Sequence, residues 1–144
     1  MKKNNLLLLA ATLVTVLNFQ SCSKYEENPP FSLSTKKSRL AGEWEVVKVD
    51  GQSSSQYFGS DETYFFEFEK DGDFEFGYTE TYNGSTYTYS YSGEWEWENN
   101  KEQIEIELQG YVIDYEIIKL TKNELILEDK SSIIFEGEIE LEKM

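Results

Sequence analysis

The chain has 144 residues, with 28 acidic and 13 basic residues, one cysteine and no histidine, and its formal net charge at pH 7 is −15. The lack of histidine excludes imidazole catalysis and histidine-ligated metals, and a single cysteine excludes an internal disulfide or a cysteine-rich metal site. The negative charge argues against nucleic acid as a partner, because phosphate binding requires a basic surface, and the length predicts one domain.

The first 22 residues have the features of a secretory signal. Two lysines precede an apolar run from Leu6 to Leu17, which is too short to span a membrane and fits a signal peptide. The segment Phe19-Gln20-Ser21-Cys22 resembles the lipobox of bacterial lipoproteins, in which the cysteine is lipidated. We therefore expect a signal peptide over residues 1–21 and a lipid on Cys22 that anchors the protein in the outer membrane. The alternative is a plain secretory signal with a free thiol.

Residues 22–39 are expected to form the lipidated N-terminus and a tether. They contain Pro29-Pro30 together with several serines, lysines and glutamates, a composition typical of a flexible segment. The stretch Ser23-Lys24-Tyr25-Glu26-Glu27 resembles the signals that send some lipoproteins to the outer cell face, which favours surface exposure. The globular domain is then expected to occupy residues 40–144.

From residue 40 onward, apolar and polar residues alternate with a period of two, which predicts β-strands. The expected strands are 43–49, 62–69, 74–82, 85–98, 103–108, one from 111 onward, one around Leu125 and Leu127, and one from 133 to about 141. Asn83-Gly84 predicts a two-residue hairpin turn, because both central positions of a type I′ turn need positive φ. That turn sets Tyr78 opposite Tyr89 and Phe76 opposite Tyr91.

The later strands continue this pattern. The register predicts Trp97 opposite Ile104 and Trp95 opposite Ile106, with a bend at Gly93. The change of parity at Ile117-Ile118 predicts a β-bulge. Eight antiparallel strands joined by tight turns predict an all-β, up-and-down β-barrel, and a two-sheet sandwich is the main alternative.

Several short motifs carry a family resemblance. Gly42-Glu43-Trp44 resembles the Gly-x-Trp signature of lipocalins, and Phe68-Glu69-Lys70-Asp71-Gly72 resembles a hairpin found in the lipocalin-like lipoproteins of Gram-negative bacteria. Gly93-Glu94-Trp95 also fits that group. The resemblance implies an eight-stranded barrel without catalytic residues, and most members of the lipoprotein group have no established function.

One face of the predicted barrel is rich in aromatic residues. An eight-stranded barrel is either filled by side chains or holds one small ligand. A solid aromatic core is one interpretation, and a cavity for a small, largely apolar ligand is the other. The residues expected to line the interior, and to contact a ligand if a cavity exists, are Trp44, Tyr64, Phe66, Phe76, Tyr78, Tyr89, Tyr91, Trp95, Trp97, Tyr111 and Tyr115.

The acidic residues alternate with these aromatics and are expected on the outer, solvated face. Asp71-Gly72-Asp73 is expected to be a hairpin tip rather than a calcium loop, and the sequence has no recognisable nucleophile motif. We therefore expect no enzymatic activity, no cofactor and no metal site. The sequence predicts a monomeric, lipid-anchored protein of the cell envelope that binds a small apolar ligand. The alternative is a structural or interaction lipoprotein with a solid core, whose acidic exterior meets a protein or polysaccharide.

Overall fold

The structure is a computed structural model that describes residues 26–27, 34–131 and 133–144. The expected signal peptide and Cys22 lie outside the described residues. The elements in chain order are β1 (Glu26–Glu27), α2 (Lys36–Leu40), β2 (Gly42–Val49), β3 (Gln52–Ser53), α3 (Ser54–Tyr57), β4 (Glu62–Phe68), β5 (Asp73–Tyr82), β6 (Ser85–Glu98), the 3₁₀ turn η1 (Asn99–Lys101), β7 (Gln103–Leu108), β8 (Tyr111–Leu120), β9 (Glu124–Asp129) and β10 (Gly137–Lys143).

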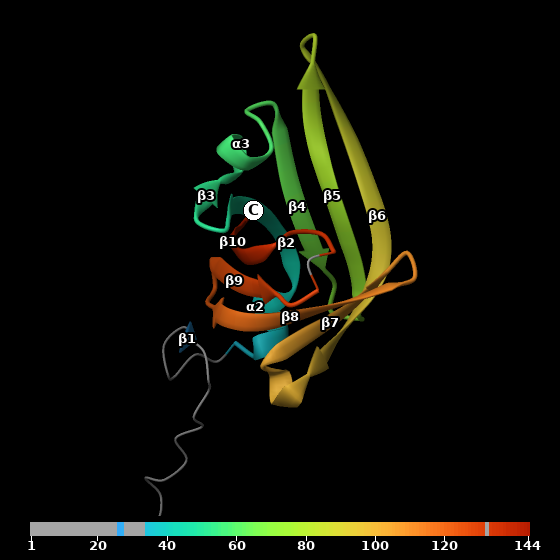
Figure 1. Ribbon diagram of the computed structural model, residues 1–144. Helices are drawn as coiled ribbons and strands as arrows, with labels where there is room; N and C mark the ends of the chain where they lie inside the picture. Colours follow the sequence, from blue (N-terminus) through green and yellow to red (C-terminus); the bar gives the residue numbers. More distant parts are fainter. Residues whose placement is uncertain (1–25, 28–33, 132) are drawn as a thin grey trace, which may run out of the picture.

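Eight of these strands close into an antiparallel barrel within the described part of the chain (Figure 1). Each strand pairs with the next along the chain from β2 and β4 through to β9 and β10, and β10 pairs back with β2. The short strand β3 pairs with β2, and β1 lies parallel to β8. The predicted up-and-down barrel is therefore confirmed, and the sandwich alternative is excluded.

The strand registers follow from the turn chemistry. Asn83 and Gly84 have φ values of 52° and 76°, as a type I′ turn requires. This turn places Tyr78 opposite Tyr89, as predicted. The pairing of β6 with β7 likewise confirms Trp95 opposite Ile106. The pairing of β8 with β9 shifts between Ile117 and Lys119, which confirms the bulge.

Alternation along the strands buries one continuous apolar face. Trp44, Phe66 and Tyr115 are fully buried, together with the inward-facing aliphatic residues of β7 to β10, which include Ile104, Ile106, Ile113, Leu120, Leu125, Leu127 and Ile139. Trp95 is 5% exposed and its indole Nε1 donates to the carbonyl of Glu69 at 2.9 Å. The middle of the barrel is thus filled by side chains rather than hollow.

A short helix closes one end of the barrel, where the sequence predicts only tether. The side chain of Thr35 caps α2 by accepting from the backbone N–H of Ser38. Leu40 is fully buried and its carbonyl accepts from Nε1 of Trp44 at 2.7 Å, which docks the helix on the core. Nζ of Lys143 lies 4.2 Å from the centroid of the Trp44 ring, a cation–π contact that covers this end. The ordered domain therefore begins before residue 40. No helix in the described residues is long and apolar enough to cross a membrane.

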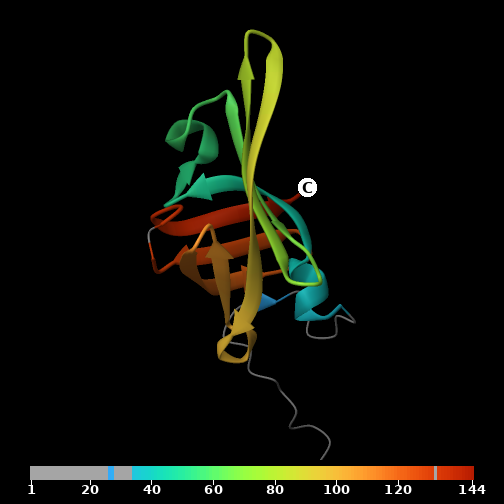
Figure 2. The same cartoon turned by 90° about the vertical axis from the view of Figure 1, so that its right-hand side faces the viewer.

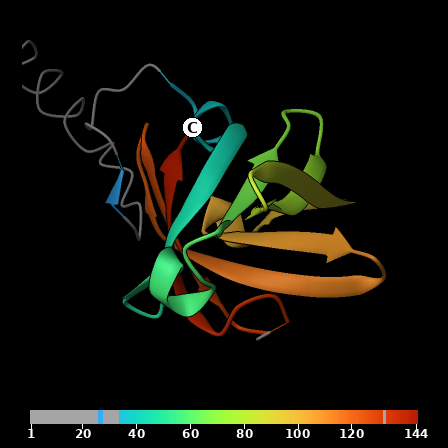
Figure 3. The ribbon, with the colours of Figure 1, turned by 90° about the horizontal axis from the view of Figure 1, so that it is seen from above.

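The other end of the barrel carries a projecting hairpin. Strands β5 and β6 continue past the rest of the barrel (Figures 1 and 2), and every residue from Ser85 to Ser92 is exposed. Helix α3 lies on one side of this end and the β7–β8 turn stands out on the other (Figure 3). The last strand begins at Gly137, not at residue 133. Ile133, Ile134 and Phe135 instead belong to the loop between β9 and β10.

Candidate functional site

A cavity of about 430 Å³ lies at the end of the barrel from which the β5–β6 hairpin projects. Side chains from both halves of the barrel contribute to it, because the strands that flank the hairpin face the β9–β10 loop across the opening. Most of the lining is apolar or aromatic, and none of it is charged. The lining residues are Phe58, Tyr64, Phe76, Tyr91, Leu108, Gln109, Tyr111, Ile113, Ile133, Ile134 and Phe135.

One wall of the cavity is a row of neighbouring rings. Phe58, which follows α3, stacks on Tyr64 of β4 with ring centroids 4.0 Å apart. Tyr64 is 6.1 Å from Phe76 of β5, and Phe76 is 6.4 Å from Tyr91 of β6, again with nearly parallel planes. The rings therefore form one stacked aromatic row that runs from the segment after α3 across β4 and β5 to β6. Such a row offers apolar surface to a small, largely apolar molecule.

Phe135 separates the cavity from the core. It is 4% exposed and its ring centroid lies 5.3 Å from Phe58 and 6.1 Å from Phe66. The loop that carries it therefore enters the barrel opening and closes the cavity from below. The run of apolar residues 133–135 was expected to begin the last strand, but it forms a loop that packs against the core through Phe135.

The polar groups near the cavity are few. The hydroxyl of Tyr64 donates to the Glu62 carboxylate at 3.0 Å. Burial, and next the hydrogen bond to that carboxylate, raise the pKa of Tyr64 to about 12. The phenol therefore stays protonated at neutral pH and offers its free lone pairs to a ligand. Tyr91, Gln109 and Tyr111 are the other polar residues in the lining, and their side chains can also form hydrogen bonds with a ligand.

The predicted interior residues fall into three groups. Four of them line the cavity: Tyr64, Phe76, Tyr91 and Tyr111. Five belong to the packed core or lie against it: Trp44, Phe66, Trp95, Trp97 and Tyr115. The remaining two, Tyr78 and Tyr89, stack on each other at 5.0 Å on the projecting hairpin.

Three of the predicted interior positions are exposed rather than enclosed. The exposed fractions are 43% for Tyr89, 42% for Tyr91 and 62% for Tyr111. These side chains lie on the strand face that the register predicts, but they stay partly exposed because β6 extends beyond the barrel and Tyr111 begins its strand beside a turn. The sequence analysis does not single out three further lining residues: Phe58 follows α3, Leu108 ends β7, and Gln109 lies in the turn after β7.

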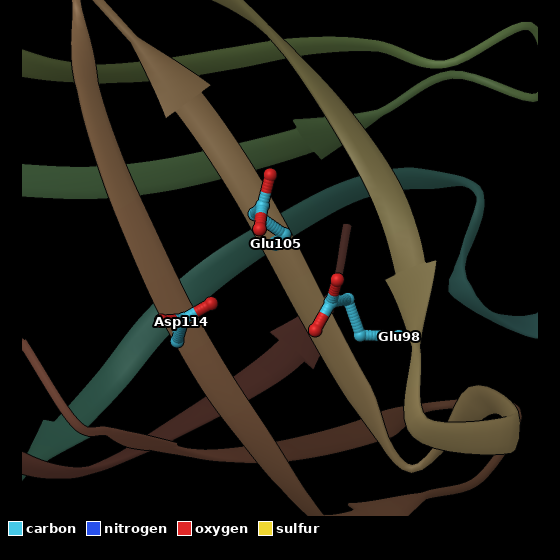
Figure 4. A group of neighbouring side chains, drawn as sticks. All are labelled: Glu98, Glu105 and Asp114. Atoms are coloured by element: carbon cyan, nitrogen blue, oxygen red, sulfur yellow. The ribbon is translucent and has the colours of Figure 1, made fainter.

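Rows of carboxylates run across the outer face. Glu96 lies opposite Glu105 and Glu105 lies opposite Asp114 in the strand pairing. Glu98, Glu105 and Asp114 place carboxylate oxygens within 4.8 Å of one another (Figure 4). Partial burial, and next the neighbouring carboxylates, raise the pKa of Glu105. Oxygen ligands of this kind suit a hard divalent cation, but exposed acidic groups such as Glu98 and Asp114 are common on protein surfaces without one.

Two further hollows, each of about 360 Å³, lie on the same outer face. Carboxylates dominate their lining, including Glu67, Glu69 and Glu75 in one and Glu96, Glu105 and Glu107 in the other. Their charge disfavours an apolar ligand. The cavity at the barrel mouth is the candidate binding site because its lining is uncharged.

Comparison with known proteins agrees with this architecture. No curated protein is similar enough in sequence to count as a relative. A family model described as a lipocalin-like domain matches residues 40–127, from the end of α2 into β9. This match spans more than half of the chain and covers the Gly42-Glu43-Trp44 motif, six of the eight barrel strands completely and most of β9. The chain therefore belongs to the lipocalin-like domain family.

Proposed function

We propose that this protein is a lipid-anchored binding protein of the bacterial cell envelope, attached through Cys22, and that the barrel-mouth cavity holds a small, largely apolar molecule. The lipobox-like segment before Cys22 supports the anchor, and the Lys-plus-acidic stretch after it supports exposure at the cell surface. The role is binding rather than catalysis, since the cavity lining carries no acid–base pair or nucleophile of the usual kind.

The uncharged, ring-lined cavity is the observation that carries the binding proposal. Its volume of about 430 Å³ falls within the roughly 300–1,000 Å³ range of small-molecule sites. The stacked row from Phe58 through Tyr64 and Phe76 to Tyr91 forms one wall, and Tyr111 of β8 also lines the cavity. A small apolar molecule would bury its surface against these side chains.

A structural or interaction role is the second candidate. The interior below Phe135 is filled by fully buried side chains such as Phe66 and Tyr115, so the barrel has no deep lumen of the kind that would enclose a long ligand. In this case the acidic exterior would serve as the contact surface, and the cavity would stay without a ligand.

Native mass spectrometry of the lipidated protein, extracted from its own host, separates the two candidates. The binding proposal predicts that a small molecule co-purifies with the unmutated protein and that much less of it co-purifies with the Tyr111→Ala variant. The matched control is Tyr82→Ala, because the exposed fractions of Tyr82 and Tyr111 are 67% and 62% but Tyr82 lies at the hairpin tip, away from the cavity. We expect Tyr111→Ala to reduce the bound fraction several-fold and Tyr82→Ala to leave it unchanged. Absence of any bound mass in the native protein would favour the structural role.

The anchor is tested separately by Cys22→Ala. We expect this variant to leave the membrane fraction and appear as folded, soluble protein in the periplasm, because the lipid is the only proposed membrane attachment. Ser55→Ala, which lies outside the lipobox-like segment, is a control that keeps the cysteine and should stay in the membrane fraction. Retention of Cys22→Ala in the membrane fraction would contradict the anchor.

A further inference from the structure

One edge of the projecting hairpin has no neighbouring strand. Strand β6 pairs with β7 only from Gly93 onward, whereas Ser85–Ser92 pair with β5 and with nothing else in the described residues. All eight of these residues are exposed. Among the described residues, the other strand segments with a single neighbour are shorter, such as residues 111–114 of β8. This segment, here named the β6 edge (residues 85–92), is therefore a place where another strand could add to the sheet.

The backbone groups at this edge point outward at alternate residues. Thr81, which lies opposite Thr86, directs its N–H to the carbonyl of Asp61 on the β4 side, and Trp95 directs its N–H to Gly72 on the β5 side. Because these directions alternate along a strand, the even-numbered residues of the β6 edge direct both N–H and C=O away from β5. Four residues, Thr86, Thr88, Ser90 and Ser92, therefore present unpaired backbone donors and acceptors.

The β6 edge also lacks the features that keep edge strands from pairing. Its sequence, Ser-Thr-Tyr-Thr-Tyr-Ser-Tyr-Ser, contains no charge, no proline and no glycine, although the whole chain carries a net charge of −15. Charged side chains, prolines and bulges are the usual protection of an exposed edge. Uncharged segments of high β-propensity are the ones that pair with other strands.

We propose that the β6 edges of two copies of this chain pair antiparallel around a two-fold axis at Thr88. A second copy fits because the uncharged edges place no carboxylates directly opposite each other, despite the strongly acidic chains. A basic peptide would find no carboxylate in the edge to recognise. The proposal replaces the monomer expected from the sequence and is independent of the ligand-binding proposal.

The position of β7 selects the register. An axis perpendicular to the sheet keeps the tyrosine faces of both copies on the same side, so paired residue numbers must have an even sum. The end of β7 at Gly93 blocks the second copy from reaching past Ser92. The longest pairing that avoids β7 sets Thr88 opposite Thr88 of the second copy, and Thr86 opposite its Ser90. Tyr87 then lies opposite Tyr89 of the second copy, an aromatic pair that extends the tyrosine row across the junction.

Cysteine cross-linking of the full-length chain in its membrane tests this register. Thr88 and its counterpart would form a hydrogen-bonded antiparallel pair, in which the two Cα atoms are about 5.5 Å apart. This distance suits a disulfide. Thr88→Cys, a small change at an exposed position, should give a disulfide-linked dimer at twice the mass of the mature, lipidated protein. Thr86→Cys and Ser90→Cys are matched controls on the same face, and each should give at least tenfold less cross-linked dimer when expressed alone. Co-expression of these two variants should restore the dimer.

A proline variant distinguishes strand pairing from cross-links that form through random collision of the chains. Ser90→Pro removes an outward N–H and leaves the β5–β6 hydrogen bonds in place, since proline is tolerated at a free edge. Added to Thr88→Cys, it should remove most of the cross-link. The pairing is overturned if Thr88→Cys fails to cross-link, if the three single cysteine variants cross-link equally, or if Ser90→Pro has no effect. All of these variants retain Cys22. The unmutated protein, which has no other cysteine, therefore gives the background level of cross-linked dimer.

Discussion

Phe135 anchors the β9–β10 loop in the barrel opening, so we expect Phe135→Ala to destabilise the domain strongly. The ring is 4% exposed and lies within 6.1 Å, centroid to centroid, of Phe58, Tyr64, Phe66 and Phe76. Removing an enclosed Phe side chain costs about 3–5 kcal/mol. One side of this ring borders the cavity, so the vacated space joins the cavity and the lower limit, about 3 kcal/mol, applies.

Urea denaturation followed by tryptophan fluorescence measures this loss. The midpoint should fall while the slope stays unchanged, since the surface exposed on unfolding is nearly the same. At about 4 °C per kcal/mol for a domain of this size, Tm should fall by about 12 °C. Ile133→Ala in the same loop is the matched control, because Ile133 is 44% exposed, and it should cost less than about 1 kcal/mol. Equal effects of the two variants would refute the docked position of Phe135.

Three further predictions address the barrel wall and its closed end. Gly93→Ala should lower the free energy of unfolding by about 1–3 kcal/mol in a urea titration, because its Cβ would lie 2.3 Å from the carbonyl oxygen of Glu107. Gly84→Ala is the control, because a Cβ at Gly84 meets open space and only the positive φ opposes it. A loss smaller for Gly93→Ala than for Gly84→Ala would contradict the close approach at Gly93. Glu105→Gln should raise Tm at pH 7 in low salt, because the raised pKa of Glu105 means that its contribution to stability is lost as pH rises through that pKa. This gain in Tm should shrink in about 1 M NaCl and disappear at acid pH, where Glu105 is protonated. A Tm of Glu105→Gln below that of the unmutated protein in low salt would contradict the prediction. Burial lowers the pKa of Lys143 to about 8 from an ordinary 10.5. The unmutated protein should therefore gain stability relative to Lys143→Met as the pH rises from about 8 to 10.5. Urea titrations at several pH values measure this difference, and a decrease over that range would contradict the burial of the Lys143 ammonium.

The sequence by itself determined the local pairing of the barrel. Alternation at period two assigned the strand faces, and the Asn83-Gly84 turn aligned β5 with β6 because few residues other than asparagine and glycine accept positive φ at both central positions. Once that register was set, side-chain parity placed Trp95 beside Ile106 and indicated the bulge at Ile117-Ile118. These are properties of one strand and its neighbour, and short-range rules describe them well.

The tertiary structure alone decided what lies across the barrel from each strand. Alternation assigns Tyr89 to the inner face but does not show that β6 extends beyond the end of the barrel. Only the assembled fold shows that this face of β6 is exposed to solvent there. The positions of Phe135 and of α2 depend likewise on loops and a short helix that have no periodic signal, and contacts with distant strands hold them in place. The cavity arises where these unpatterned segments meet the aromatic face, because its shape depends on distances between residues far apart in the chain.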